Sequence, residues 1–198
     1  MIETEGITGL VLAGGMGRRM DSRDKGLVAF RGKAMVAHVI ERFAPQVQSI
    51  TINANRTIET YASFGLPIVS DELSGFAGPL AGLHAGMRAC KTPWLATAPC
   101  DSPFLPLDLV ARLSEAAARE SADIAVAFSD GFAQPVFALY TTSLLSSLEA
   151  FLTSGERKID KWTAQHRVAN VVFEDAAGFA NINTIDELIA LQDVAARG

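Results

Sequence analysis

The chain has 198 residues, of which 49% are hydrophobic, and this size and composition predict one folded domain and exclude general disorder. The formal net charge is −5 with both signs mixed along the chain, which excludes the basic face of a nucleic-acid-binding protein. No run of about 18 apolar residues predicts a membrane span. The two cysteines predict no disulfide framework, and the N-terminus lacks the apolar run of a signal peptide, so we expect a cytoplasmic protein.

Apolar runs of strand length alternate with helical patterns through the first half of the chain. The continuous apolar run 9–13 predicts a strand that is buried on both faces, and helical spacing in 36–43 predicts a helix that ends at Pro45. Pro79 predicts the start of a helix, because its missing N–H costs nothing in the first turn. Further strands are expected at 49–53, 67–70 and 94–98.

The second half continues the alternation. Strands at 124–128 and 135–140 are joined through Asp130-Gly131, and this short connection favours an adjacent, antiparallel pair. Other elements are a helix that opens at Pro106, a helix at 144–152, a strand at 168–173 and a last helix at 185–191, which Thr184 and Glu187 would cap. The whole pattern predicts an α/β fold with three layers, in which helices cover both faces of a mainly parallel, twisted sheet. Ligands of such folds bind at the carboxyl ends of the strands.

A glycine-rich loop directly follows the first predicted strand. It reads Leu12-Ala13-Gly14-Gly15-Met16-Gly17-Arg18-Arg19-Met20 and continues to Asp24-Lys25-Gly26. Glycines let backbone N–H groups approach phosphate oxygens, and the loop's arginines and Lys25 add charged donors. The dinucleotide-binding fingerprint requires glycine where Met20 stands, and the P-loop requires Ser or Thr where Gly26 stands. We therefore predict a polyphosphate site of another kind, the alternative being an ordinary loop with incidental glycines.

Polar residues also follow the later strands of the first half. Asp101 comes just after the strand 94–98, where a carboxylate that faces the phosphate loop suits Mg²⁺. Asn53 and Asp71 end the second and third strands, and their side chains can pair with a base edge or a ribose. Taken alone, both are equally explained as turn residues. Cys100 is expected to be a small buried side chain rather than a nucleophile, because no partner base is identifiable.

A second group of residues suggests the far end of the same site. Gly82 lies in the first turn of a predicted helix, where glycine costs stability, so a ligand or backbone should approach it closely. Asn181 and Asn183 precede the last helix, whose unpaired N–H groups favour an anion. Gly78 and Arg157 belong to the same group, for which the alternative is turn residues and solvated charges.

Taken together, these residues resemble the molybdenum cofactor guanylyltransferases, within the Rossmann-like nucleotidyltransferase superfamily. The motifs that carry the resemblance cover nearly the whole chain: the loop 12–25, Asn53-Ala54-Asn55-Arg56, Asp71, Gly78-Pro79-Leu80-Ala81-Gly82, Pro99-Cys100-Asp101-Ser102-Pro103, Gly155-Glu156-Arg157 and Asn181-Ile182-Asn183-Thr184. The resemblance implies Mg²⁺-dependent transfer of GMP from GTP to the terminal phosphate of molybdenum-molybdopterin, with release of pyrophosphate.

The resemblance also implies a role for each residue of these motifs. Asp101 would be the metal ligand, and Lys25 and Arg19 would act with it in catalysis. The residues that bind the nucleotide would be Leu12, Ala13, Gly14, Gly15, Gly17, Lys25, Asn53, Asp71 and Asp101. The residues on the acceptor side would be Gly78, Gly82, Arg157, Asn181 and Asn183. The single domain would bind nucleotide through about 1–105 and the acceptor through about 106–198. We expect a monomer that makes transient contacts with other proteins of the cofactor pathway, and no membrane partner.

Two alternatives stay open on the sequence alone. A related nucleotidyltransferase would use CTP or a sugar-phosphate-like acceptor, although the Leu-Ala-Gly-Gly start resembles the guanylyl branch more than the cytidylyl branch. A non-catalytic GTP-binding carrier or sensor would not need both Lys25 and Asp101. The chain departs from the family pattern at Asp21, where the loop usually continues with glycine, and at Ile185, where proline is common.

Overall fold

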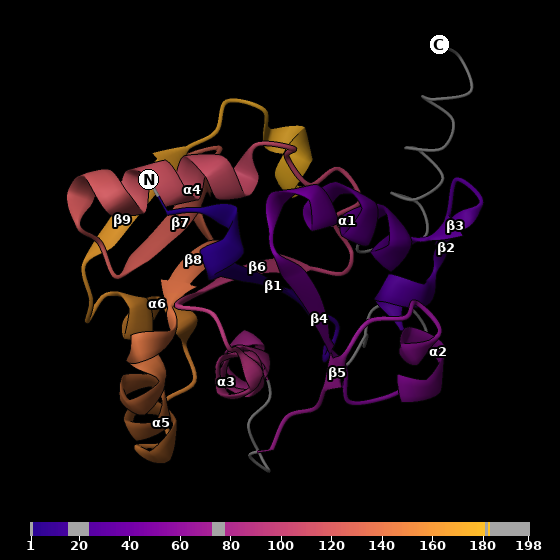
Figure 1. The fold of residues 1–198 in the computed structure, drawn as a ribbon, viewed down its shortest axis with the longest axis horizontal. Coiled ribbons are helices and arrows are strands. Elements are labelled where there is room, and N and C mark those ends of the chain that lie inside the picture. The colour runs from indigo at the N-terminus through magenta and orange to yellow at the C-terminus, as the bar shows by residue number, and fades with distance from the viewer. Residues whose placement is uncertain (1, 16–23, 73–77, 181, 183–198) are drawn as a thin grey trace.

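The computed structural model describes residues 2–15, 24–72, 78–180 and 182 (Figure 1). Within these ranges, seven strands form one sheet in the order β5-β4-β1-β6-β8-β7-β9. Four parallel strands make up its first part, namely β1 (Ile7–Leu12), β4 (Ser49–Asn53), β5 (Ile68–Val69) and β6 (Trp94–Pro99). They agree with the four strands predicted in the first half, with ends that shift by one or two residues.

The remaining strands come from the second half of the chain. β8 (Phe132–Thr141) runs antiparallel to both β6 and β7 (Ile124–Ser129), whereas β9 (Val168–Val172) is parallel to β7. The β7–β8 turn has positive φ at Asp130 and at Gly131, which suits the residue types found there. The predicted antiparallel hairpin and the predicted mainly parallel sheet are therefore both confirmed.

Helices cover both faces of this sheet, as Figure 1 shows. α1 (Met35–Phe43) and α4 (Leu109–Glu120) pack on one face, and α3 (Pro79–Ala89) and α5 (Leu145–Thr153) pack on the other. Successive strand residues point to opposite faces, so Val11 joins the core beneath α1 while Leu10 joins the core beneath α3. This double burial explains why the strand reads as an unbroken apolar run.

Several short helices, turns and strands were not predicted, because their few residues show neither helical spacing nor strand alternation. They are the helices α2 (Ile58–Ala62) and α6 (Ile159–Thr163), the hairpin of β2 (Ala29–Phe30) with β3 (Lys33–Ala34), and 3₁₀ turns at Thr4–Gly6, Lys25–Leu27, Ala44–Gln46, Thr142–Leu144 and Ala176–Phe179. α4 begins at Leu109 rather than at Pro106, since Asp108 still has non-helical backbone angles. The predicted helix 185–191 lies outside the described residues, as do Thr184 and Glu187. Within the described ranges, no helix combines the length and the apolar character needed to cross a bilayer.

Candidate active site

The carboxyl ends of β1, β4 and β6 meet at one end of the sheet. The register places Leu12 beside Asn53 on one side and beside Pro99 on the other. Backbone hydrogen bonds continue past the strands, because the N–H of Ala13 donates to Asn53 O at 2.8 Å and that of Cys100 donates to Leu12 O at 3.1 Å. The loops after these strands are thus held side by side, which is where ligands of such sheets bind.

Lys25 and Asp101 come together at this end. Lys25 opens the 3₁₀ turn Lys25–Leu27, and its Nζ lies 3.2 Å from Asp101 Oδ2. Their side chains are only 22% and 12% exposed, so the pair is shielded from solvent. Less water around the two charges strengthens every electrostatic contact that they make. Two residues that the sequence predicted separately therefore form one charged centre.

Tyr61 on α2 is linked to this centre through Asp24, and no sequence motif pointed to this residue. Its side chain is fully buried, and its hydroxyl donates to Asp24 Oδ1 at 2.5 Å. Thr57 donates to the other oxygen of Asp24 at 3.4 Å. Burial raises the pKa of the Tyr61 hydroxyl far above its usual value, and neighbouring Cys100 and Asp24 raise it further. Tyr61 is therefore a neutral, permanent donor.

Gly26 completes the packing between this tyrosine and β6. A Cβ on Gly26 would lie 2.5 Å from the Tyr61 hydroxyl and 3.0 Å from Cys100 Cβ, so a larger residue would have to displace its neighbours. Cys100 is buried, as predicted. Burial raises the pKa of its thiol, and the nearby carboxylates of Asp101 and Asp24 raise it further, which keeps the group protonated and unreactive.

A network of amide donors holds the carboxylate of Asp71. Asn53 Nδ2 donates to Asp71 Oδ1 at 2.9 Å, and Asn55 Nδ2 donates to Asp71 Oδ2 at 2.7 Å. The backbone N–H of Asp71 donates in turn to Asn55 Oδ1 at 2.8 Å. Asn53 is buried at 2% exposure, whereas Asp71 is half-buried. The buried amide thus orients the carboxylate, which is the more accessible of the two predicted nucleotide contacts.

The described part of the glycine loop is held by the segment after β4. Asn55 Nδ2 donates to Gly14 O at 3.4 Å, and Arg56 Nη2 donates to Gly15 O at 3.3 Å. A Cβ on Gly14 would lie 2.8 Å from Asn53 Oδ1 and from Asn55 Nδ2, so this position leaves little room for a side chain. Gly17, Arg18, Arg19 and Asp21 lie outside the described residues.

Gly78 and Gly82 both belong to the start of α3. Gly78 caps the helix with φ +128°, a backbone conformation that favours glycine, and Pro79 follows in the first turn as predicted. A Cβ on Gly82 would overlap Asn53 Oδ1 and Leu12 Cδ2. The groups that approach Gly82 closely are therefore side chains of the protein, where the sequence predicted a ligand or backbone, and its contact with an acceptor stays a prediction.

The other predicted acceptor residues lie on later segments. Arg157 Nη1 donates to Leu152 O at 3.1 Å and to Glu156 O at 2.7 Å, so this nitrogen satisfies carbonyls at and beyond the end of α5. Asn181 and Asn183 lie outside the described residues. Ile182 between them is buried, and its N–H donates to Asp101 O at 3.1 Å. This contact joins residue 182 to the backbone of Asp101.

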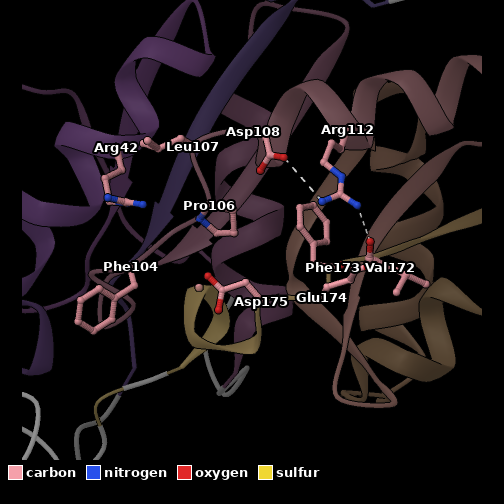
Figure 2. A pocket seen from close by; sticks show the side chains of 11 residues that line it. Arg42, Phe104, Pro106, Leu107, Asp108, Arg112, Val172, Phe173, Glu174 and Asp175 are labelled. Carbon is pink, nitrogen blue, oxygen red and sulfur yellow. Dashed lines mark hydrogen bonds and ion pairs between the residues drawn. The ribbon is translucent and has the colours of Figure 1, made fainter.

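A separate hollow of about 700 Å³ opens between α1, α4 and the end of β9 (Figure 2). Figure 2 shows Arg112 between Asp108 and the carbonyl of Val172, and its guanidinium lies 4.0 Å from the centre of the Phe173 ring. None of the described residues that line it is a predicted site residue. Because both of its arginines already donate to backbone carbonyls, Arg42 to Leu105 O and Arg112 to Val172 O, we place the active site at the strand ends instead.

Comparison with known proteins identifies the family. Residues 9–170 match the family model described as the MobA-like NTP transferase domain. The chain belongs to the MobA-like nucleotidyltransferases. A molybdenum cofactor guanylyltransferase of Cupriavidus necator is 54% identical over 193 residues, which cover 95% of this chain and 97% of that protein. A protein of the same name from Bordetella petrii is 54% identical over 192 residues, which cover 95% and 98%.

Solved structures of MobA-like and other nucleotidyltransferases share the fold. Molybdopterin-guanine dinucleotide biosynthesis protein A from Archaeoglobus fulgidus superposes with a TM-score of 0.80 at 25% identity, over 96% of this chain and 100% of that one. The 4-diphosphocytidyl-2C-methyl-D-erythritol synthase of Anaerococcus prevotii, at 12% identity, shares the fold alone, with a TM-score of 0.73 over 99% of this chain and 100% of that one. The resemblance found in the sequence, the fold class and the assignment as a nucleotidyltransferase enzyme are confirmed.

Proposed function

We propose that this nucleotidyltransferase transfers GMP from GTP to the terminal phosphate of a molybdopterin-type acceptor and releases pyrophosphate. The observation that carries the proposal is the shielded pair of Lys25 with Asp101, 3.2 Å apart, at the end of the sheet where Gly14 and Gly15 begin the glycine loop. A cation donor, a metal-binding carboxylate and backbone N–H groups at one place are what a triphosphate requires.

The nucleotide would extend from the glycine loop toward Asp71. Gly14 and Gly15, with Leu12, Ala13 and Gly17 beside them, would present backbone groups to the phosphates. The half-buried carboxylate of Asp71 has lone pairs beyond those used by Asn53 and Asn55, and it can accept from the amino group of guanine. Asn53 would act mainly by orienting Asp71. Guanine offers N–H donors to such a carboxylate, and this match supports GTP as the substrate.

Asp101 would hold Mg²⁺. Carboxylate oxygens are ligands that Mg²⁺ prefers. The carboxylate of Asp101 already pairs with one positive charge, the ammonium group of Lys25. When bound, Mg²⁺ neutralises part of the negative charge on the triphosphate and on the departing pyrophosphate. Lys25 would donate to the phosphate oxygens on which charge develops, and Arg19 is proposed for the same task. The acceptor phosphate is already ionised at neutral pH, so the chain needs no strong general base.

The acceptor would bind on the far side of this centre. Gly78, Gly82, Arg157, Asn181 and Asn183 are proposed to line it, and the contact of Ile182 with Asp101 supports a role for the 181–183 segment. The acceptor site would then draw on both the nucleotide-binding part, about 1–105, and the part from about 106 to 198. We further propose a cytoplasmic protein that passes its product to other proteins of the pathway. We also propose that it is a monomer, which gel filtration of the purified protein would test.

The decisive experiment combines the purified protein with GTP, Mg²⁺ and molybdopterin, and measures pyrophosphate release and product mass. We expect a product one GMP heavier than the acceptor, and complete loss of turnover when EDTA removes the metal. Faster turnover with CTP or with a sugar phosphate would identify the related transferase instead. Tight GTP binding without any turnover would favour the carrier or sensor, and turnover that survives EDTA would refute the metal assignment.

A further inference from the structure

The two tyrosines of the chain are both buried, but their hydroxyl groups serve different places. Tyr140 on β8 donates to Pro135 O at 2.6 Å within its own strand. Tyr61 instead donates to a side chain 37 residues away, the carboxylate of Asp24, directly before Lys25. A bond between a buried hydroxyl and a charged carboxylate is a strong one, because the acceptor is ionised. Of the two tyrosines, Tyr61 is therefore the one that ties a distant element to the charged centre.

The tie fixes the backbone on both sides of Lys25. Asp24 caps the 3₁₀ turn Lys25–Leu27, and its carbonyl accepts the N–H of Leu27 at 3.0 Å. On the other side, Gly26 packs between the Tyr61 hydroxyl and Cys100. Cys100 directly precedes Asp101 in the chain. The Tyr61 hydroxyl thus lies against Asp24 and Gly26, the residues before and after Lys25. The side chain of Lys25 itself reaches Asp101.

The same contacts also direct the charge of Asp24. Both of its oxygens accept donors from the α2 segment, one from Tyr61 and one from Thr57. Without these donors, a carboxylate next to Lys25 would be free to pair with the lysine or to repel a triphosphate. These two bonds hold the negative charge of Asp24 against the α2 segment.

We propose that Tyr61 is a positioning residue for nucleotidyl transfer, which acts through Asp24 to hold Lys25 in its productive place. The inference rests on the proposed function, and it goes further by assigning a role to a buried tyrosine that touches neither substrate in that scheme. The alternative is that Tyr61 only stabilises the core around α2. The two differ in one respect: positioning acts through Lys25, whereas a core role is independent of it.

The test is a double-mutant cycle of Tyr61→Phe with Lys25→Ala, read by kcat and by the Kd for GTP in the presence of Mg²⁺. Tyr61→Phe alone should lower kcat by about tenfold or more and raise the Kd for GTP by several-fold, since displacement of a group that contacts the phosphates by an ångström is costly. In the Lys25→Ala background the same substitution should change kcat and Kd by less than about twofold. Tyr140→Phe is the matched control, because it also removes one buried hydroxyl donor, and it should leave kcat unchanged in both backgrounds.

Equal effects of Tyr61→Phe in the two backgrounds, or equal losses for the two tyrosines, would overturn the proposal. Should Tyr61→Phe fail to fold, Asp24→Ala replaces it in the cycle, and Asp24→Asn, which keeps an oxygen for the tyrosine, should recover much of the loss. An Asp24→Asn as weak as Asp24→Ala would contradict the role of the hydrogen bond. If the wild type binds GTP without transferring GMP, the proposed function is wrong and the Kd cycle still decides the role of Tyr61. If it binds no GTP, both are wrong.

Discussion

The two ends of the sheet each carry an aspartate paired with a cation, but under different conditions. At the carboxyl end, Asp101 pairs with Lys25, and both side chains are largely shielded. At the amino end, Asp123 precedes β7 and pairs with Arg167 at 2.7 Å, with side chains that are 26% and 68% exposed. Water weakens the second pair and leaves it a small structural role. Exposure to solvent, rather than the pairing of an aspartate with a cation, thus distinguishes the pair at the candidate site from a surface pair.

Other polar side chains also differ between the two ends of the sheet. At the amino end, polar side chains bond to each other or to backbone, as when Thr8 meets Thr92 at 2.9 Å and Thr142 donates to Pro93 O at 3.0 Å. At the carboxyl end, amide donors of Asn53 and Asn55 converge on a half-buried carboxylate. Substitutions at the carboxyl end should therefore reduce activity, and substitutions at the amino end should affect only stability.

Asp101→Ala should have the largest effect. Loss of the proposed metal ligand and of the partner of Lys25 is expected to lower kcat by on the order of 10³-fold. Circular dichroism should show a folded protein, because Asp101 lies outside the hydrophobic core clusters. Pyrophosphate release with GTP and Mg²⁺ measures the effect, and release near the wild-type rate would contradict the proposed role of Asp101 in turnover.

Lys25→Ala should come next. Removal of one charged donor to the phosphates is expected to cost about 3 kcal/mol in transition-state stabilisation, or roughly 10²-fold in kcat. Lys161→Ala is the matched control, since Lys161 makes an exposed pair with Glu156 at 3.0 Å. Steady-state kinetics of the two variants measures the difference, and similar kcat values for both would show that the shielded pair matters no more to turnover than the exposed one.

The site could be predicted from the sequence as far as chain order and strand geometry reach. Parallel strands bring their carboxyl ends together, so Asp101 was expected to face the glycine-rich loop, whereas its direct bond with Lys25, across 76 positions, was not predicted. Contacts that depend on how a short helix packs could not be predicted. Tyr61 lies on the five-residue α2, and its partner Asp24 is visible only once that helix is placed. Gly82 shows the same limit, because the glycine predicted a close approach but did not indicate that Asn53 and Leu12 are the residues that make it.

Asp71→Asn should have a moderate effect. The asparagine keeps one oxygen but lacks the second acceptor that donors of guanine would use, so kcat/KM for GTP is expected to fall about tenfold, near the low end of 1–3 kcal/mol. The preference for GTP over CTP should narrow at the same time. Competition between the two nucleotides measures this ratio, and an unchanged ratio would place base recognition elsewhere.

Asp123→Asn, at the amino end, should have the smallest effect and a distinctive pH dependence. Hydrogen bonds from Arg167 hold the pKa of Asp123 below its ordinary value, against a smaller opposing effect of burial. A carboxylate whose folded pKa is lowered contributes stability above its unfolded pKa, and this contribution is lost as the pH falls through the folded pKa. The wild type should therefore melt no more than about 2 °C above the variant at pH 7, and the two melting curves should converge as the pH falls below about 4. The activity at pH 7 should be unchanged, in contrast to Asp101→Ala. A melting difference that grew toward low pH, or a loss of kcat, would show that this exposed pair does more than stabilise the amino end of the sheet.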